Sequence, residues 1–147
     1  MVRVRYAMAA LMAIVSLSGC KEEKVVQKSH PATLEESGQK GIMRVILTQR
    51  AAERIGIETA QIREEVVTSN AGAAPRKVVP YGAILYDKKG DTWTFTNPQP
   101  LVFVRQAIAV ERIDGDRVVL AEGPPPGTAV VTVGAAELMG AEHKYGH

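Results

Sequence analysis

From Tyr81 onwards, turn-forming residues divide the chain into short apolar segments that alternate as β-strands do. Thr92–Thr96 is the clearest of them, because Trp93 and Phe95 fall on one face at the two-residue period of a half-buried strand. Helical spacing occurs only in brief stretches, Gln49–Ile55 and Ala135–Met139. The sequence therefore predicts a mainly β domain, a small antiparallel β-barrel or roll with one or two short helices.

Two longer segments and a loop complete the expected domain. Ile57–Val67 and Leu101–Ile113 each alternate along their length and predict one continuous strand. Ser69–Pro75 consists of small and polar residues, which predicts a linker or a wide loop. Thr48 and Gly56 bracket the first helix as its expected N-cap and C-terminal glycine.

The first twenty residues have the organisation of an export signal. Arg3 and Arg5 precede an apolar stretch that is shorter than the about 20 residues a helix needs to cross a membrane. The stretch ends in four residues that resemble the lipobox of bacterial lipoproteins: Leu17, Ser18, Gly19 and Cys20. Residues 1–19 are therefore predicted to be a lipoprotein signal peptide, with Cys20 as the lipidation site. An ordinary signal peptide and a buried apolar helix are the alternatives.

The single cysteine supports the lipoprotein interpretation. Cys20 has no second cysteine with which to form an internal disulfide, and an unmodified thiol in an exported protein is a liability. Several acyl chains at this position hold a protein on a membrane stably. We therefore expect a lipid anchor on the periplasmic side of a bacterial cell envelope, and the choice between inner and outer membrane stays open.

The rest of the chain divides by composition. Residues 20–41 are rich in charged and polar side chains and predict a flexible tether after the lipidated cysteine. Residues 42–140 predict a single β-rich domain, and residues 141–147 a flexible tail. Arg3 and Arg5 account for the formal net charge of +2, so the chain beyond them is neutral. A nucleic-acid partner is not expected, because no excess of positive charge remains.

The sequence contains little that indicates a catalytic or metal-binding site. It contains no P-loop, no serine-hydrolase elbow, no His-Glu-x-x-His and no Cys-x-x-Cys motif. The weak metal-binding candidates are His143 and His147, which offer too few ligands for a structural zinc site. We therefore expect neither an enzyme nor a cofactor nor a metal centre.

Two blocks of the sequence resemble the periplasmic adaptor (membrane-fusion) proteins of resistance-nodulation-division efflux pumps. The first block is Val45–Ala60, with its Gly-Ile-x-Thr opening at residues 56–59. The second block combines four stretches: Val79–Tyr86, Val102–Gln106, Gly123–Gly127 and Ala129–Ala135. A full adaptor carries lipoyl half-motifs, a long helical hairpin and a β-barrel domain between these blocks, whereas only residues 63–78 separate them here. The resemblance is thus to a truncated form, the membrane-proximal domain alone.

This resemblance implies a membrane-anchored lipoprotein that serves as an accessory, adaptor-like subunit of an efflux transporter. Its expected partners are the inner-membrane transporter or full-length adaptor subunits. The contact residues that turn position suggests are Lys88, Lys89, Pro124, Pro125 and Pro126. The alternative is a free-standing lipoprotein that binds a small ligand or a metal ion, with Tyr81, Tyr86 and Trp93 around the site. A decayed adaptor remnant without function is a third interpretation.

Overall fold

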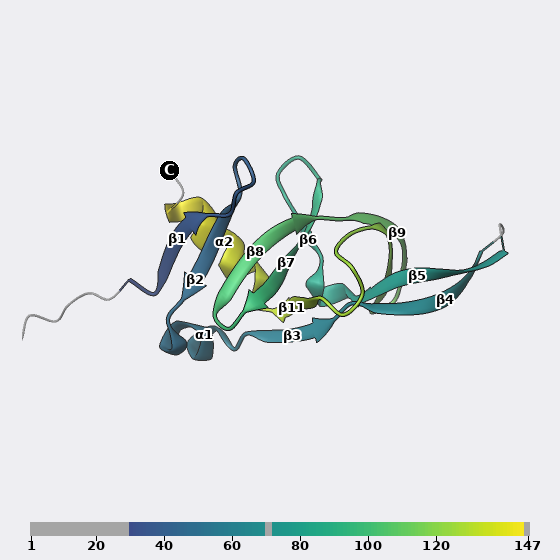
Figure 1. Ribbon diagram of the computed structural model, residues 1–147, viewed down its shortest axis with the longest axis horizontal. Coiled ribbons are helices and arrows are strands. Elements are labelled where there is room, and N and C mark those ends of the chain that lie inside the picture. Colours follow the sequence, from purple (N-terminus) through teal and green to yellow (C-terminus); the bar gives the residue numbers. More distant parts are fainter. Residues whose placement is uncertain (1–29, 70–71, 146–147) are drawn as a thin grey trace, which may run out of the picture.

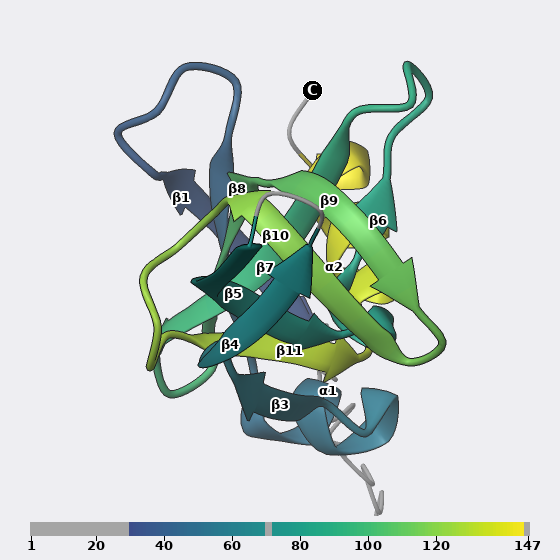
Figure 2. The ribbon, with the colours of Figure 1, turned by 90° about the vertical axis from the view of Figure 1, so that its right-hand side faces the viewer.

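Two antiparallel β-sheets make up the chain, and strands pass from one sheet to the other (Figures 1 and 2). The computed structural model describes residues 30–69 and 72–145. The first sheet has the order β1 (Ala32–Glu36), β2 (Met43–Leu47), β8 (Val102–Ala107), β7 (Thr92–Gln99), β11 (Ala129–Val133) and β3 (Glu58–Gln61), and β6 (Leu85–Tyr86) also pairs with β7. The second sheet has the order β4 (Arg63–Ser69), β5 (Gly72–Pro80), β10 (Arg117–Glu122) and β9 (Ala109–Asp114).

The prediction of a mainly β, antiparallel domain with two short α-helices is confirmed. These helices are α1 (Gln49–Ile55) and α2 (Ala135–Tyr145), and a 3-10 turn, η1, covers Tyr81–Ala83. Neither sheet closes into a barrel, because the outer strands of each sheet do not pair with one another among the described residues. The arrangement is instead like a β-sandwich.

Two buried isoleucines mark two of the places where the chain crosses between the sheets. Ile62 separates β3 from β4, and its backbone N–H donates to the carbonyl of Thr128 at 2.9 Å. Ile108 separates β8 from β9, and its N–H donates to the carbonyl of Thr92 at 3.1 Å. The predictions of single strands over 57–67 and 101–113 were therefore wrong. Alternation continues through a crossing, so it does not reveal that the strand has changed sheets.

Helix α1 begins and ends as its sequence predicts. The Thr48 side-chain oxygen accepts a hydrogen bond from the N–H of Ala51 at 3.2 Å, which satisfies one of the helix's first donors. Gly56 follows the helix with a φ of 71°, a left-handed conformation that a residue with a Cβ adopts at a cost. These two residues place the short helix between β2 and β3.

The ordered domain begins earlier than residue 42. Strand β1 pairs along its whole length with β2, from Ala32 opposite Leu47 to Glu36 opposite Met43. Ala32 is buried and Leu34 packs against the same core, so alternate residues of this strand supply apolar contacts. The prediction of a flexible tether over 20–41 was therefore wrong for β1, because its few apolar residues lie at the right period. Residues 20–29 lie outside the described part of the chain.

The prediction of a loop at Ser69–Pro75 was wrong for Ser69 and for Gly72–Pro75, which belong to strands, and residues 70–71 lie outside the described part of the chain. β4 and β5 form a hairpin whose register runs from Arg63 opposite Val78 to Ser69 opposite Gly72. Figure 1 shows this hairpin extending away from the rest of the domain, at the end opposite α2. The small residues that resemble a loop in composition are compatible with a strand when a partner strand supplies the hydrogen bonds.

The interior is divided into two neighbouring cores. The first lies beneath α2 on one face of the first sheet and draws on both sequence blocks, with Val45, Leu47, Ala51, Phe95, Phe103, Val131 and Leu138 among its members. The second lies where the two sheets meet, and its members are Ile62, Val79, Ala83, Ile84, Ile108, Val118, Leu120 and Val130. Neighbouring residues of β11, Val130 and Val131, belong to different cores, so this strand is buried on both faces. The two blocks therefore share one interior.

Candidate docking site

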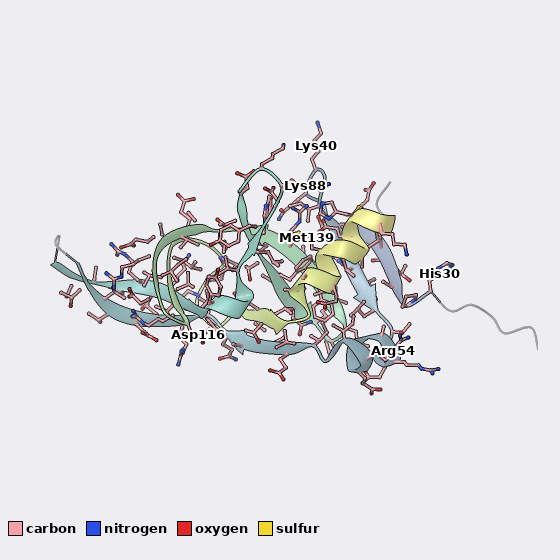
Figure 3. The ribbon with its side chains drawn as sticks, turned by 180° about the vertical axis from the view of Figure 1, so that it is seen from behind. His30, Lys40, Arg54, Lys88, Asp116 and Met139 are labelled. Carbon is pink, nitrogen blue, oxygen red and sulfur yellow. The ribbon has the colours of Figure 1, made fainter. Side chains whose placement is uncertain are left out.

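The turn between β6 and β7 presents two predicted contact residues, Lys88 and Lys89, on one side of the domain. Both side chains are exposed, and Figure 3 shows Lys88 on a projecting loop. The carboxylate of Asp87 orders this turn, because its Oδ1 accepts the backbone N–H of Lys89 at 2.8 Å and that of Asp91 at 3.0 Å. The lysines thus stand on a turn of defined shape.

The pKa of Asp87 lies below its ordinary value of 3.8. Partial burial is the largest single effect and acts to raise this pKa, whereas the hydrogen bonds from the N–H groups of Lys89 and Asp91 lower it. The indole of Trp93, whose Nε1 donates to Oδ2 at 3.2 Å, and the positive charge of Lys89 lower it further. The turn therefore keeps its ionised carboxylate at neutral pH.

We expect the stabilising effect of Asp87 to depend on pH. A carboxyl group whose pKa is lower in the folded state stabilises that state above its unfolded value of 3.8, and the effect disappears as pH falls through the folded pKa. Asp87→Asn will therefore lower the free energy of unfolding at pH 7, and the difference from the parent chain will shrink as the pH falls below 3.8. Urea unfolding across this pH range measures the effect, with the exposed Asp116→Asn as the control. A difference that is constant with pH would contradict it.

A buried ion pair between Arg105 and Glu142 connects this turn to the core through Trp93. The guanidinium of Arg105, on β8, lies over the ring of Trp93, with 4.2 Å between its Cζ and the ring centroid. Its Nη2 donates to Oε1 of Glu142 at 3.3 Å, and its Nε lies 3.0 Å from Oε2 outside hydrogen-bond geometry. Glu142 Oε1 also accepts the backbone N–H of Met43 at 3.1 Å. A continuous chain of polar contacts therefore joins the β6–β7 turn to β8, α2 and β2; we call it the Trp93 network.

The Trp93 network corrects the prediction of a flexible tail at residues 141–147 over its first part, 141–145, whereas residues 146–147 lie outside the described part of the chain. Helix α2 continues to Tyr145, and Glu142 is only 4% exposed. The sequence contained a signal for this, because Ala135, Leu138 and Glu142 share the helical face that the spacing i, i+3, i+7 defines. Sequence reasoning also missed Arg105, whose partner lies 37 residues away in the chain.

The other predicted contact loop, between β10 and β11, is held against the domain. Pro125 and Pro126 are exposed, but Pro124 is buried, so its prediction as a contact residue was wrong. The Lys77 ammonium donates to the carbonyl of Gly123 at 2.6 Å, and the N–H of Gly127 donates to the carbonyl of Ile62 at 2.8 Å. These bonds at both ends of the loop turn its first proline inward.

The two predicted contact loops do not form one surface. Figure 2 shows the loop between β6 and β7 at the upper right and the connection from β10 to β11 at the left of the domain. The structure therefore leaves two separate candidate contacts, Lys88–Lys89 and Pro125–Pro126, rather than the combined set that turn position suggested.

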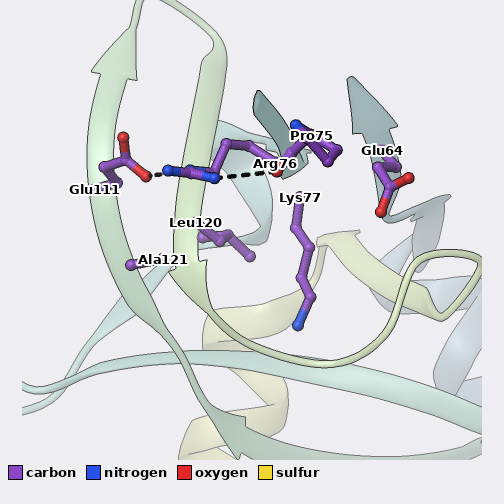
Figure 4. A pocket seen from close by; sticks show the side chains of 7 residues that line it. All are labelled: Glu64, Pro75, Arg76, Lys77, Glu111, Leu120 and Ala121. Carbon is purple, nitrogen blue, oxygen red and sulfur yellow. Dashed lines mark hydrogen bonds and ion pairs between the residues drawn. The ribbon is translucent and has the colours of Figure 1, made fainter. Parts of the chain in front are cut away.

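A shallow pocket of about 270 Å³ lies on the second sheet near the β10–β11 loop (Figure 4). Arg76 reaches across β10 to Glu111, with 3.0 Å between its Nε and Oε2, and Lys77 also lines the pocket. Both cations already have partners, since Lys77 binds Gly123 and Arg76 binds Glu111 and the carbonyl of Pro75. The two cations of this pocket are therefore already paired, as charged side chains on a solvent-exposed sheet face often are.

No group of three His, Cys, Asp or Glu side chains that could hold a metal ion occurs in the part of the chain that the structure describes. His143 is exposed, and its Nδ1 lies 2.7 Å from the carbonyl of Met139. His147 and the four lipobox residues Leu17, Ser18, Gly19 and Cys20 lie outside the described residues. Of the aromatic residues grouped by the ligand-binding alternative, Tyr81 and Tyr86 are about half exposed, whereas Trp93 has one ring face occupied by Arg105.

Comparison with known proteins adds no relative: no family model, curated protein or solved structure matches the chain. Among the described helices, none has the length and apolar character needed to cross a bilayer. The class supported at this point is a mainly β domain with two exposed loops as candidate contacts.

Proposed function

We propose that this chain is a lipid-anchored, non-catalytic docking module on the periplasmic side of a bacterial cell envelope. It binds an inner-membrane efflux transporter or the full-length adaptor subunits of that transporter. The anchor is Cys20, at the end of the lipobox-like residues 17–20. Because a membrane-bound chain meets its membrane-bound partner at a raised local concentration, a small contact surface is sufficient.

One observation carries this proposal. The two sequence blocks that resemble an adaptor's membrane-proximal domain pair directly in space, β2 with β8 and β3 with β11. They also contribute to the same core. The two blocks therefore belong to one domain, in which β7 lies between β8 and β11, and the β4–β5 hairpin spans the interval between the blocks. Because that interval holds no long helical hairpin, we expect the chain alone not to restore efflux in a strain that lacks a full-length adaptor.

The ordered β6–β7 turn is the first contact to test. We expect a photo-crosslinking amino acid at position 88 or 89 of the full chain in membranes to capture the transporter or an adaptor subunit. The matched control is position 54, an exposed arginine on α1 that Figure 3 shows on the opposite side from Lys88. Equal capture from position 54, or capture of neither partner from any position, would contradict the proposal.

Reversing the charges of the two lysines tests whether they contribute to the contact. Replacing Lys88 and Lys89 together with glutamate should lower the yield of crosslinks from Pro125 or from a neighbouring position of the turn. Replacing Arg50 and Arg54 together with glutamate changes the net charge equally but leaves the β6–β7 turn intact. A loss of crosslinks with both pairs would indicate a general charge effect instead of a contact at the turn.

A further inference from the structure

The β4–β5 hairpin projects as a two-stranded arm with an unpaired edge. β5 pairs with β10 only over Lys77–Pro80, so the outer half of the hairpin has no third strand. Figure 1 shows this half extending beyond the other strands. A two-stranded ribbon is marginally stable in water without further packing. The arm is therefore suited to gain stability from an added strand.

The β4 side of the arm lacks the features that usually protect an edge. The segment from Val66 to Pro75 contains no charged residue. Val66 is 72% exposed, the highest value among the large apolar side chains that the structure leaves exposed. Edge strands are normally protected against pairing by charged side chains, prolines or covering loops. On β4 none of these occurs beyond Glu65.

Pro75 blocks the outer edge of β5 and so leaves the edge of β4 as the open one. It lies opposite Val66 in the hairpin register, and a strand proline lies where its nitrogen faces away from the paired strand. The outer edge of β5 therefore lacks a donor at this position and is blocked. By the alternation of antiparallel ladders, the N–H and C=O of Val66 also point away from β5, toward the open edge of β4. Glu64 and Thr68, two residues to either side, present their backbone groups in the same direction.

We infer that the open edge of β4 pairs with β4 of a second copy of this chain, antiparallel and centred on Val66. In this register Val66 lies opposite Val66 of the second copy, Glu64 opposite Thr68 and Glu65 opposite Val67. No two like charges lie directly opposite each other, which is the arrangement that cross-strand pairing favours. Shifting the register so that Glu64 lies opposite Glu65, or opposite its own counterpart, brings carboxylates together. The register centred on Val66 thus brings the two exposed valines together without opposing like charges, and the contact has the two-fold symmetry of common homodimers.

The contact is expected to be weak, because a single pair of strands buries less than the about 1,000 Å² of a typical stable interface. The full chain in detergent should show a concentration-dependent dimer by sedimentation velocity between about 10 µM and 1 mM, the range of weak association. Val66→Lys places two like charges on the symmetry axis and should reduce the dimer at least about tenfold, whereas the β-branched Val66→Thr should retain it. A chain that stays monomeric throughout, or a Val66→Lys variant that dimerises equally, would overturn the inference.

Crosslinking tests the register independently of affinity. Val66→Cys should form a disulfide-linked dimer under mild oxidation, because directly opposite residues of a hydrogen-bonded antiparallel pair lie about 5.5 Å apart between Cα atoms. Val133→Cys is the matched control, since Val133 is also exposed but lies on β11 in the other sheet. The parent chain measures any background from Cys20. Equal crosslinking of both variants, or adducts of Val66→Cys with another protein instead of a second copy, would refute this arrangement. The outcome is independent of the transporter proposal, which concerns the β6–β7 and β10–β11 loops and not the arm.

Discussion

Replacing Glu142 with alanine will lower the free energy of unfolding by about 3–5 kcal/mol, the usual cost of removing one member of a buried ion pair. The side chains of Arg105 and Glu142 are only 10% and 4% exposed, so the variant leaves a guanidinium buried without its counter-charge. It also removes the acceptor of the Met43 N–H. Urea unfolding followed by circular dichroism measures the change.

Two further variants distinguish the cost of leaving a charge buried and unpaired from the cost of a general loss of packing. Glu65→Ala removes a carboxylate that lies 2.8 Å from Arg117, but both side chains are about one-third exposed, so we expect a cost of at most about 1 kcal/mol. The double variant Arg105→Met, Glu142→Leu replaces both charges with apolar groups and should be far more stable than Glu142→Ala. A cost of Glu142→Ala no larger than that of Glu65→Ala would show that the pair is not buried in solution.

The Trp93 network links this ion pair to the proposed contact turn. Because Arg105 contacts both Trp93 and Glu142, and Trp93 donates to Asp87, one set of contacts joins α2 to the turn that carries Lys88 and Lys89. The proposed contact turn is therefore supported by groups that lie far from it in the sequence. Loss of Glu142 is expected to perturb the environment of Trp93 as well as the end of α2.

The parts of the fold that could be predicted are those with local causes. Thr48 and Gly56 bracket α1 because capping depends on a few adjacent residues, and the turn that carries Lys88 and Lys89 follows from its own residues. The crossings at Ile62 and Ile108 could not be predicted, because they depend on which strand lies beside each isoleucine. Neither changes the alternating pattern of the sequence.

The candidate site likewise contains features that the local sequence predicts and features that depend on distant contacts. Lys88 and Lys89 are exposed on a turn, as their sequence context predicts, whereas Pro124 is buried by bonds that Lys77 and Ile62 make to the ends of its loop. The Arg105–Glu142 pair depends on α2 packing across the first sheet, which no local pattern encodes. A carboxylate on the apolar face of a short helix was the one sequence signal available for it.

The core beneath α2 joins the two sequence blocks around Phe95. Phe95 is fully buried and is the largest such side chain in the described chain, and it packs in the core that contains Val45 and Leu47 from the first block. Phe95→Ala should lower the free energy of unfolding by about 3–5 kcal/mol, since it leaves a cavity that the surrounding sheet cannot fill. Tyr86→Ala removes a ring that is half exposed on the neighbouring strand β6, and we expect it to cost under about 1 kcal/mol.

The same unfolding curves test whether the blocks form one cooperative unit. Trp93 is the only tryptophan and reports on the first sheet, whereas far-ultraviolet circular dichroism reports on both sheets. Because Val130 and Val131 connect the two cores through β11, we expect the two signals to change together in the parent chain and in Phe95→Ala. If Phe95→Ala shifted only the tryptophan transition, the two cores would unfold separately. The adaptor-like blocks would then not form the single domain on which the docking proposal depends.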